Sequence, residues 1–169
     1  MDRLFTDSAC RCLEQYSTRI ADSVSRLSED QVWARGSKNE NAVGNLMLHL
    51  AGNVRQWILT GVGGQPDNRQ RDAEFAAAGG IAANEMLARL RDTVREACAV
   101  IAALDAAQLE ERRTIQGDDV SVLEAVFHVV EHFSMHTGQI LFAVKLLTHE
   151  DLGYYRHLRG GQGHRETTP

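Results

Sequence analysis

The sequence predicts an all-α protein, a four-helix bundle with a long crossover connection between helices 2 and 3. Proline is nearly absent, with Pro66 and the terminal Pro169 as its two occurrences. Long stretches rich in alanine, leucine, glutamate and arginine favour helices. Apolar residues also recur at spacings of three and four along four separate segments, as they do on the buried face of a helix.

The first two helices are expected in the N-terminal half of the chain. Apolar spacing predicts the first from residue 2 to about residue 27. The second is predicted to begin near Asn41 or Ala42 and to end at the glycine-rich residues 61–64. It carries His49 beside its apolar face, where a lone histidine is usually structural.

The last two helices are expected after the crossover. The third is predicted over residues 84–104, and residues 113–118 are compatible with a short hairpin. The fourth begins near Ser121, because Ser121 and Glu124 have the spacing of a capping box, and continues to about residue 147.

The chain is predicted to form a single bundle domain over residues 1–150, followed by a loose C-terminal tail over residues 151–169. The crossover, residues 65–80, is polar and long for a connection in a compact domain. Loops of that length tend to be functional or mobile. It is therefore expected either to cover a site near the second helix or to be a solvated connection.

Charge and composition exclude several classes of function. The net charge is −5 and there is no basic stripe, which disfavours nucleic-acid binding. No apolar run is long enough to span a membrane, and no apolar signal region begins the chain. The three cysteines form no disulfide-like framework, which suits a reducing compartment. A cytoplasmic protein is expected.

The most informative stretch is residues 128–140, which holds three of the seven histidines at spacings of four. Two histidines four residues apart lie on one helix face and can bind a single metal ion. His128 and His136 are separated by about 12 Å of helix rise. One pair, either His128 with His132 or His132 with His136, is therefore expected to provide metal ligands.

Two other interpretations of these histidines remain open at this point. Residues His128, Glu131 and His132 match H-x-x-E-H, the inverted zinc-protease helix with glutamate as general base. The match is short, the proteases that use it are far larger, and Glu131 points about 100° away from His132 around the helix. The histidines are equally compatible with a polar stripe that binds no metal.

If His49 joins one pair, three imidazoles leave an open position on a metal, as in catalytic sites. Neutral imidazole suits zinc, nickel, copper and iron, so the ligands alone do not select the ion. A bound ion lowers the pKa of water or a thiol and so produces a nucleophile at neutral pH. The sequence identifies no catalytic residue.

Two segments carry a resemblance to a known family. Residues 46–53, LMLHLAGN, and residues 132–140, HFSMHTGQI, resemble the DinB-like family of bacterial proteins. The pattern His-x-x-x-His-x-Gly-Gln in the fourth helix is that family's hallmark. The resemblance extends from the second helix to the end of the fourth, and residues 67–75 resemble one branch of mostly unknown function.

The resemblance implies a four-helix bundle, commonly a homodimer, with a divalent metal on three histidines. Zinc or nickel is the expected ion, with manganese or iron as further possibilities. His128 then flanks the site, Gln139 is a hydrogen-bond partner of a ligand, and Gly138 allows close helix approach. Carried over by position, the ligands are His49, His132 and His136.

Some relatives in that family are transferases or isomerases that use a low-molecular-weight thiol such as mycothiol or bacillithiol. The resemblance therefore implies a thiol-dependent transferase or isomerase with such a thiol as cosubstrate. A non-catalytic metal- or ligand-binding stress-response dimer and a metal-dependent hydrolase are the alternatives. An exposed apolar face on the first or third helix would support dimerisation.

Overall fold

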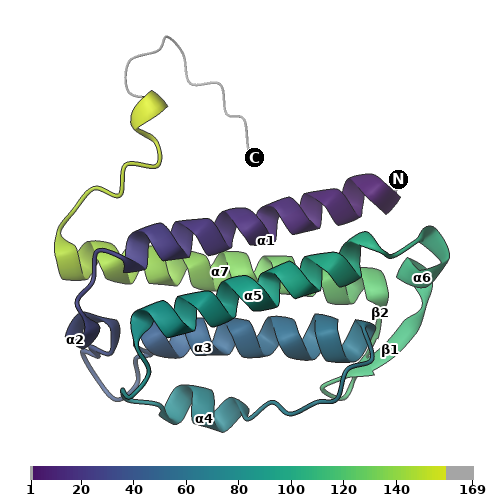
Figure 1. Cartoon of the computed structure of the whole chain (residues 1–169), viewed down its shortest axis with the longest axis horizontal. Coiled ribbons are helices and arrows are strands. Elements are labelled where there is room, and N and C mark those ends of the chain that lie inside the picture. The colour runs from purple at the N-terminus through teal and green to yellow at the C-terminus, as the bar shows by residue number, and fades with distance from the viewer. Residues whose placement is uncertain (1, 159–169) are drawn as a thin grey trace.

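A computed structural model describes residues 2–158 of the chain (Figure 1). Residues 2–158 form helices and one small hairpin, which confirms the all-α prediction. Its elements are α1 (Asp2–Val24), α2 (Glu29–Val32), α3 (Val43–Val54), η1 (Arg55–Val62), α4 (Arg71–Ala76), α5 (Ala83–Ala102), α6 (Ala106–Glu110), β1 (Arg112–Ile115), β2 (Asp118–Ser121), α7 (Val122–Thr148) and η2 (Arg156–Leu158).

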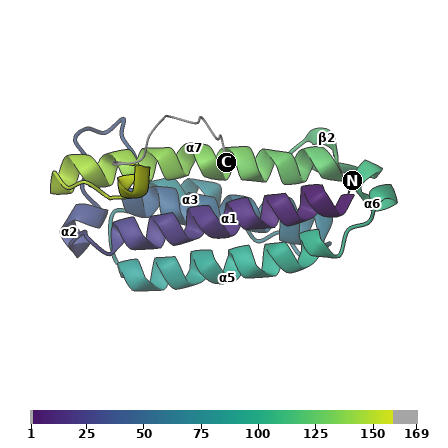
Figure 2. The same ribbon diagram turned by 90° about the horizontal axis from the view of Figure 1, so that it is seen from above.

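Four long helical segments, α1, α3 with η1, α5 and α7, form the bundle (Figures 1 and 2). Helix α1 packs against α5 and α7, and α3 packs against the same two helices. In Figure 1, α1 and α7 run in one direction and α3 and α5 in the other. Since α3 and α5 are parallel neighbours, a long crossover must connect them, and the polar connection predicted from the sequence does so.

The core of the bundle is built from the apolar stripes that the helical spacing predicts. Burying one large aliphatic or aromatic side chain contributes roughly 1.5–3 kcal/mol to folding. All four long segments contribute side chains with almost no exposure, including Leu13, Ile20, Met47, Leu50, Ile58, Leu59, Leu90, Ile101, Phe133 and Ile140.

The segment η1 is a π-helix that continues α3, and the sequence did not predict it. Its wider turn is visible where Gly63 N donates to Ile58 O at 2.8 Å. At Gly61, a β-carbon would overlap the side chain of Ile115, so glycine lets the hairpin pack closely against η1. π-helical turns are often found at functional sites.

The crossover is ordered against α3 and contains a short helix, α4, that the sequence did not predict (Figure 1). The buried Asn45 side chain donates to the carbonyls of Glu74 at 2.9 Å and Ala77 at 2.8 Å. The Arg35 guanidinium donates to Asn45 Oδ1 and to the Ala77 carbonyl, both at 2.7 Å. These bonds hold the crossover in place along α3.

The hairpin compatible with residues 113–118 is present as β1 and β2, with Ile115 opposite Asp118. Its two turn residues, Gln116 and Gly117, both have positive φ, at 56° and 92°. Two consecutive positive φ values match the right-handed twist of a hairpin, which explains the glycine.

The chain beyond α7 packs against α1 further than the predicted start of the tail at residue 151. Leu152 is only 6% exposed, and the Tyr154 hydroxyl lies 2.8 Å from Ser23 Oγ. The Tyr154 hydroxyl also donates to the Arg19 carbonyl at 2.9 Å, and Arg26 donates to the Leu152 carbonyl at 3.4 Å, so a buried side chain and several hydrogen bonds hold this segment. Residues 159–169 of the predicted tail lie outside the described residues. No helix within residues 2–158 is both long and apolar enough to cross a membrane.

Candidate metal centre

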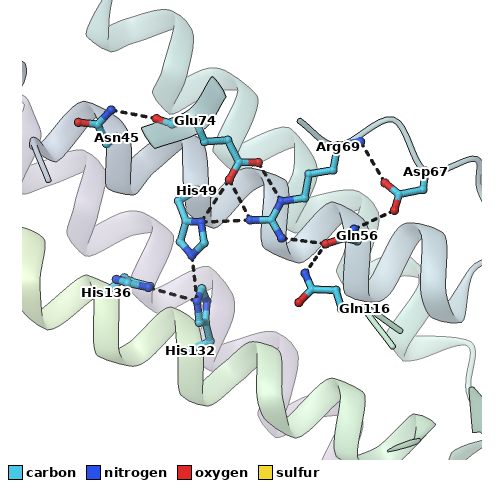
Figure 3. A network of polar contacts seen from close by, with 9 residues as sticks. All are labelled: Asn45, His49, Gln56, Asp67, Arg69, Glu74, Gln116, His132 and His136. Atoms are coloured by element: carbon cyan, nitrogen blue, oxygen red, sulfur yellow. Dashed lines mark hydrogen bonds and ion pairs between the residues drawn. The ribbon is translucent and has the colours of Figure 1, made fainter. Parts of the chain in front are cut away.

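Antiparallel packing of α3 and α7 brings three histidines together (Figure 3). His49 comes from α3, and His132 and His136 come from adjacent turns of α7. The Nε2 atom of His132 lies 3.1 Å from Nε2 of His49 and 3.1 Å from Nε2 of His136. One ligand atom from each residue lies within 4.8 Å of the other two.

This arrangement fits a divalent metal ion. Two imidazole nitrogens bound tetrahedrally to zinc lie about 3.3 Å apart. The 3.1 Å separations are close to that value. Burial, together with the neighbouring histidines, lowers the pKa of His132 to about 3, so its ring is neutral at pH 7 and keeps a free electron pair. An all-imidazole set suits several divalent ions and does not distinguish zinc from nickel.

Hydrogen bonds to the other ring nitrogens orient two of the three rings. His49 Nδ1 lies 3.2 Å from Glu74 Oε2, and His136 Nδ1 lies 2.7 Å from Gln139 Oε1. An ionised carboxylate or amide oxygen only accepts, so each Nδ1 carries a hydrogen and each Nε2 is the atom that faces the cluster. Arg69 Nη2 also lies 3.1 Å from His49 Nδ1, but it donates to Glu74 Oε2 at 2.8 Å. Metal-binding histidines are commonly fixed in this way.

The partner of His49 is an ionised carboxylate that the crossover places beside it. Arg69 donates to Glu74 through Nε at 2.8 Å and through Nη2 at 2.8 Å, a bidentate pair. The Arg69 side chain is only 4% exposed. Burial raises the pKa of Glu74, but hydrogen bonds from Arg69 and His49 outweigh it and lower that pKa overall. Gly52 of α3 leaves the space that this carboxylate occupies.

A wider polar network ties the site to η1 and to the hairpin (Figure 3). Arg69 Nη1 donates to Gln56 Oε1 at 2.9 Å, and Gln56 Nε2 donates to Asp67 Oδ2 at 2.8 Å. Gln116 in the hairpin turn also donates to Gln56. The sequence singled out the crossover as a possible cover for a site, but its charge alternation did not show which residue would reach the histidines.

The remaining predicted residues lie around the triad. The His128 ring packs on Trp57, 4.0 Å between centroids, and lies 5.5 Å from the His132 ring. The structure therefore gathers His49 with His132 and His136, and not with His128. Glu131 is exposed on α7 and is not part of the histidine cluster, so it does not provide the general base that the H-x-x-E-H interpretation requires.

Gly138 does not serve helix packing within the described chain. It is exposed, and a β-carbon there would meet no atom within 4 Å. The predicted close helix approach is therefore absent from the bundle itself, because Gly138 lies on the outer face of α7.

Replacing Glu74 with glutamine is expected to weaken divalent metal affinity about 10–100-fold, because such outer partners orient the ligand ring and raise its basicity. Titration against a chromogenic chelator measures the affinity. Asp72→Asn is the matched control, since Asp72 is an exposed carboxylate of the same short helix. Equal affinities for the Glu74 variant and wild type would show that the carboxylate does not support His49.

Comparisons with known proteins support the fold and do not supply an activity. No curated protein matches the chain. A conserved protein from Enterococcus faecalis, known from its crystal structure, superposes with a TM-score of 0.73 at 14% sequence identity. The superposition covers 86% of this chain and 98% of that one. At that identity the likeness concerns the fold alone.

The profile of one protein family matches residues 1–159, which is nearly the whole chain. That family is described only as a protein of unknown function. Neither comparison names the DinB-like family, so that resemblance stays a prediction. The chain belongs to the family of proteins of unknown function DUF1572.

Proposed function

We propose that this protein is a divalent-metal-dependent enzyme that activates a low-molecular-weight thiol for transfer to an electrophile. The observation that carries the proposal is the convergence of three imidazole nitrogens from His49, His132 and His136. Three protein ligands leave a position open for a small molecule, which distinguishes catalytic from structural metal sites. A divalent ion held there supplies a Lewis acid that lowers the pKa of a thiol or of water.

The polar groups around the cluster favour a thiol over water. Hydrolysis by water is usually assisted by a general base, and the carboxylate that contacts the cluster, Glu74, is already engaged by Arg69 and His49. A thiol with a lowered pKa is a strong nucleophile without such a base. Cys10, Cys12 and Cys98 lie on α1 and α5, and none belongs to the cluster of possible metal ligands, so the proposed nucleophilic sulfur comes from a cosubstrate.

The experiment is a spectrophotometric transfer assay on untagged protein loaded with zinc or nickel. Mycothiol or bacillithiol is the donor, and chlorodinitrobenzene is the electrophile, from which the sulfur displaces chloride. We expect turnover that requires both metal and thiol and that is lost in His132→Ala. Turnover of an activated ester without thiol would support the hydrolase instead. Metal binding without turnover by either route would support a non-catalytic metal-binding protein.

We also infer that a second copy of the chain covers an exposed apolar face of α7. Gly138, which nothing covers within residues 2–158, lies on the outer side of that helix and lets another backbone approach. A patch that pairs with itself suits a two-fold dimer. The face lies on the fourth long helix and not on the first or third. Its large exposed residues are Leu123, Phe127, Met135, Phe142 and Leu146.

Phe142→Glu is expected to convert the dimer to a monomer, because it places a charge on this face at a side chain that is 64% exposed in the single chain. Sedimentation velocity measures the mass, and circular dichroism checks that the bundle is intact. Leu4→Glu is the control, since Leu4 is exposed on α1. A wild-type monomer, or a dimer that survives Phe142→Glu, would contradict this inference.

A further inference from the structure

Two cysteines that are 88 residues apart face each other where α1 crosses α5, which lie side by side in Figure 2. The Cys10 sulfur lies 3.7 Å from the Cys98 carbonyl oxygen. Reciprocally, the Cys98 sulfur lies 3.9 Å from the Cys10 carbonyl oxygen. Each side chain therefore spans the interface and reaches the backbone of the other residue.

Small neighbours allow this close approach. Ala9 and Ala97, next to the two cysteines, are both buried in the core. A disulfide requires α-carbons within about 4.4–6.8 Å and β-carbons that point toward each other. Two thiols that each contact the opposite backbone lie on facing sides of the two helices, which favours the second condition and brings the two backbones close together. Cys12, two residues further along α1, points about 200° away around the helix and cannot share this geometry.

The two thiols differ in reactivity in a way that suits oxidation. A hydrogen bond from the Cys98 thiol lowers the pKa of Cys10, which is partly exposed. The same contact and burial raise the pKa of Cys98. Oxidants react with accessible thiolates, and a nearby second thiol then resolves the product. Cys10 therefore has the properties of the first thiol to react, and Cys98 those of the resolving thiol.

We propose that Cys10 and Cys98 are a site of reversible oxidation by hydrogen peroxide, which joins them in a disulfide between α1 and α5. The Cys10 thiolate attacks one peroxide oxygen, the O–O bond breaks, and the leaving hydroxide takes up a proton to become water. The Cys98 sulfur then attacks the Cys10 sulfur of the sulfenic acid, the S–O bond breaks, and a second water leaves. Two thiols are oxidised and one peroxide is reduced to two waters.

The proposed disulfide would join α1 and α5, which carry none of the three clustered histidines, so the inference does not depend on the proposed enzyme function. It links residues far apart in the chain, which restricts the unfolded state and stabilises the fold. For a protein of this size the melting temperature is expected to rise on the order of 5–10 °C. Reducing agents should reverse the rise.

The experiment uses the full-length, fully reduced protein with a chelator present, so that bound metal catalyses no oxidation. Hydrogen peroxide is added at one equivalent, free thiols are alkylated, and intact mass and non-reduced peptide maps are recorded. We expect an intramolecular link between the Cys10 and Cys98 peptides, one alkylated thiol at Cys12, and reversal by dithiothreitol. The melting temperature is measured on the same samples.

Cys12→Ser is the matched control and should form the link and show the same thermal shift as wild type. Cys98→Ser should form no link and leave Cys10 as a sulfenic acid, which dimedone labels. The reduced variants are compared by circular dichroism to confirm that they fold. Full alkylation of all three cysteines after peroxide, a link through Cys12, or links only between chains would overturn the proposal.

Discussion

Replacing His132 with alanine is expected to reduce bound divalent metal from about one ion per chain to a background level. His132 has the largest effect because its Nε2 is the central atom of the cluster, 3.1 Å from the Nε2 atoms of both His49 and His136. Without it only two imidazoles remain, His49 from α3 and His136 from α7, with 5.1 Å between ring centroids, and two ligands hold a metal ion less tightly than three. Elemental analysis of untagged protein, after incubation with zinc or nickel and dialysis, measures the loss.

The control for this prediction is His128→Ala. His128 lies one turn earlier on α7 and is half-buried like His132, but it packs on Trp57 outside the cluster. It should keep the metal. Added zinc at a hundred times the dissociation constant should stabilise wild type and the control by about 2.7 kcal/mol and leave His132→Ala unchanged. If the His132→Ala protein retained one ion per chain, the three histidines would not be the metal site.

Phe133→Ala is expected to lower the free energy of unfolding by about 3–5 kcal/mol, because it removes a large side chain that has no exposed surface. Phe133 stacks with Tyr16 of α1, with 6.3 Å between ring centroids, at the packing of α1 against α7. Phe133 follows His132 in the sequence, but its side chain points into the core, so the cavity forms in the core of the bundle. Urea unfolding with a chelator present measures the bundle without any contribution from metal.

Leu4→Ala is the comparison for that variant, because Leu4 is a large apolar residue that is 73% exposed. Its effect should stay within about 0.5 kcal/mol. Equal stability of the two variants would show that α7 does not pack on α1 through Phe133.

The helices could be predicted from the sequence because their signals are local. Apolar spacing, the near absence of proline and the capping pair Ser121 and Glu124 each act over a few residues. The same holds for the spacing of His128, His132 and His136, which places successive histidines one helix turn apart, although spacing alone left open which of the two pairs binds a metal. The choice of His49 as third member rested on a family resemblance and not on spacing, since no local pattern connects residues 83 positions apart.

The groups that surround the triad could not be predicted in this way. Glu74 and Arg69 reach His49 only because Asn45 and Arg35 fix the crossover along α3, and Gly52 leaves room for the carboxylate. These contacts join separate segments, and each depends on the others. The π-helix η1 likewise has no sequence signature that distinguishes it from the end of an ordinary α-helix.

The sequence by itself determined the helical class, the extent of the four long helices and the spacing by four of the histidines on α7, because helical periodicity and turn chemistry are properties of neighbouring residues. Only the tertiary structure decided that His49 faces His132 and His136, and that Glu74 orients the His49 ring. It also decided that Cys10 lies opposite Cys98 where α1 packs on α5. Those contacts follow from how whole helices pack, and packing depends on the fit of the complete core.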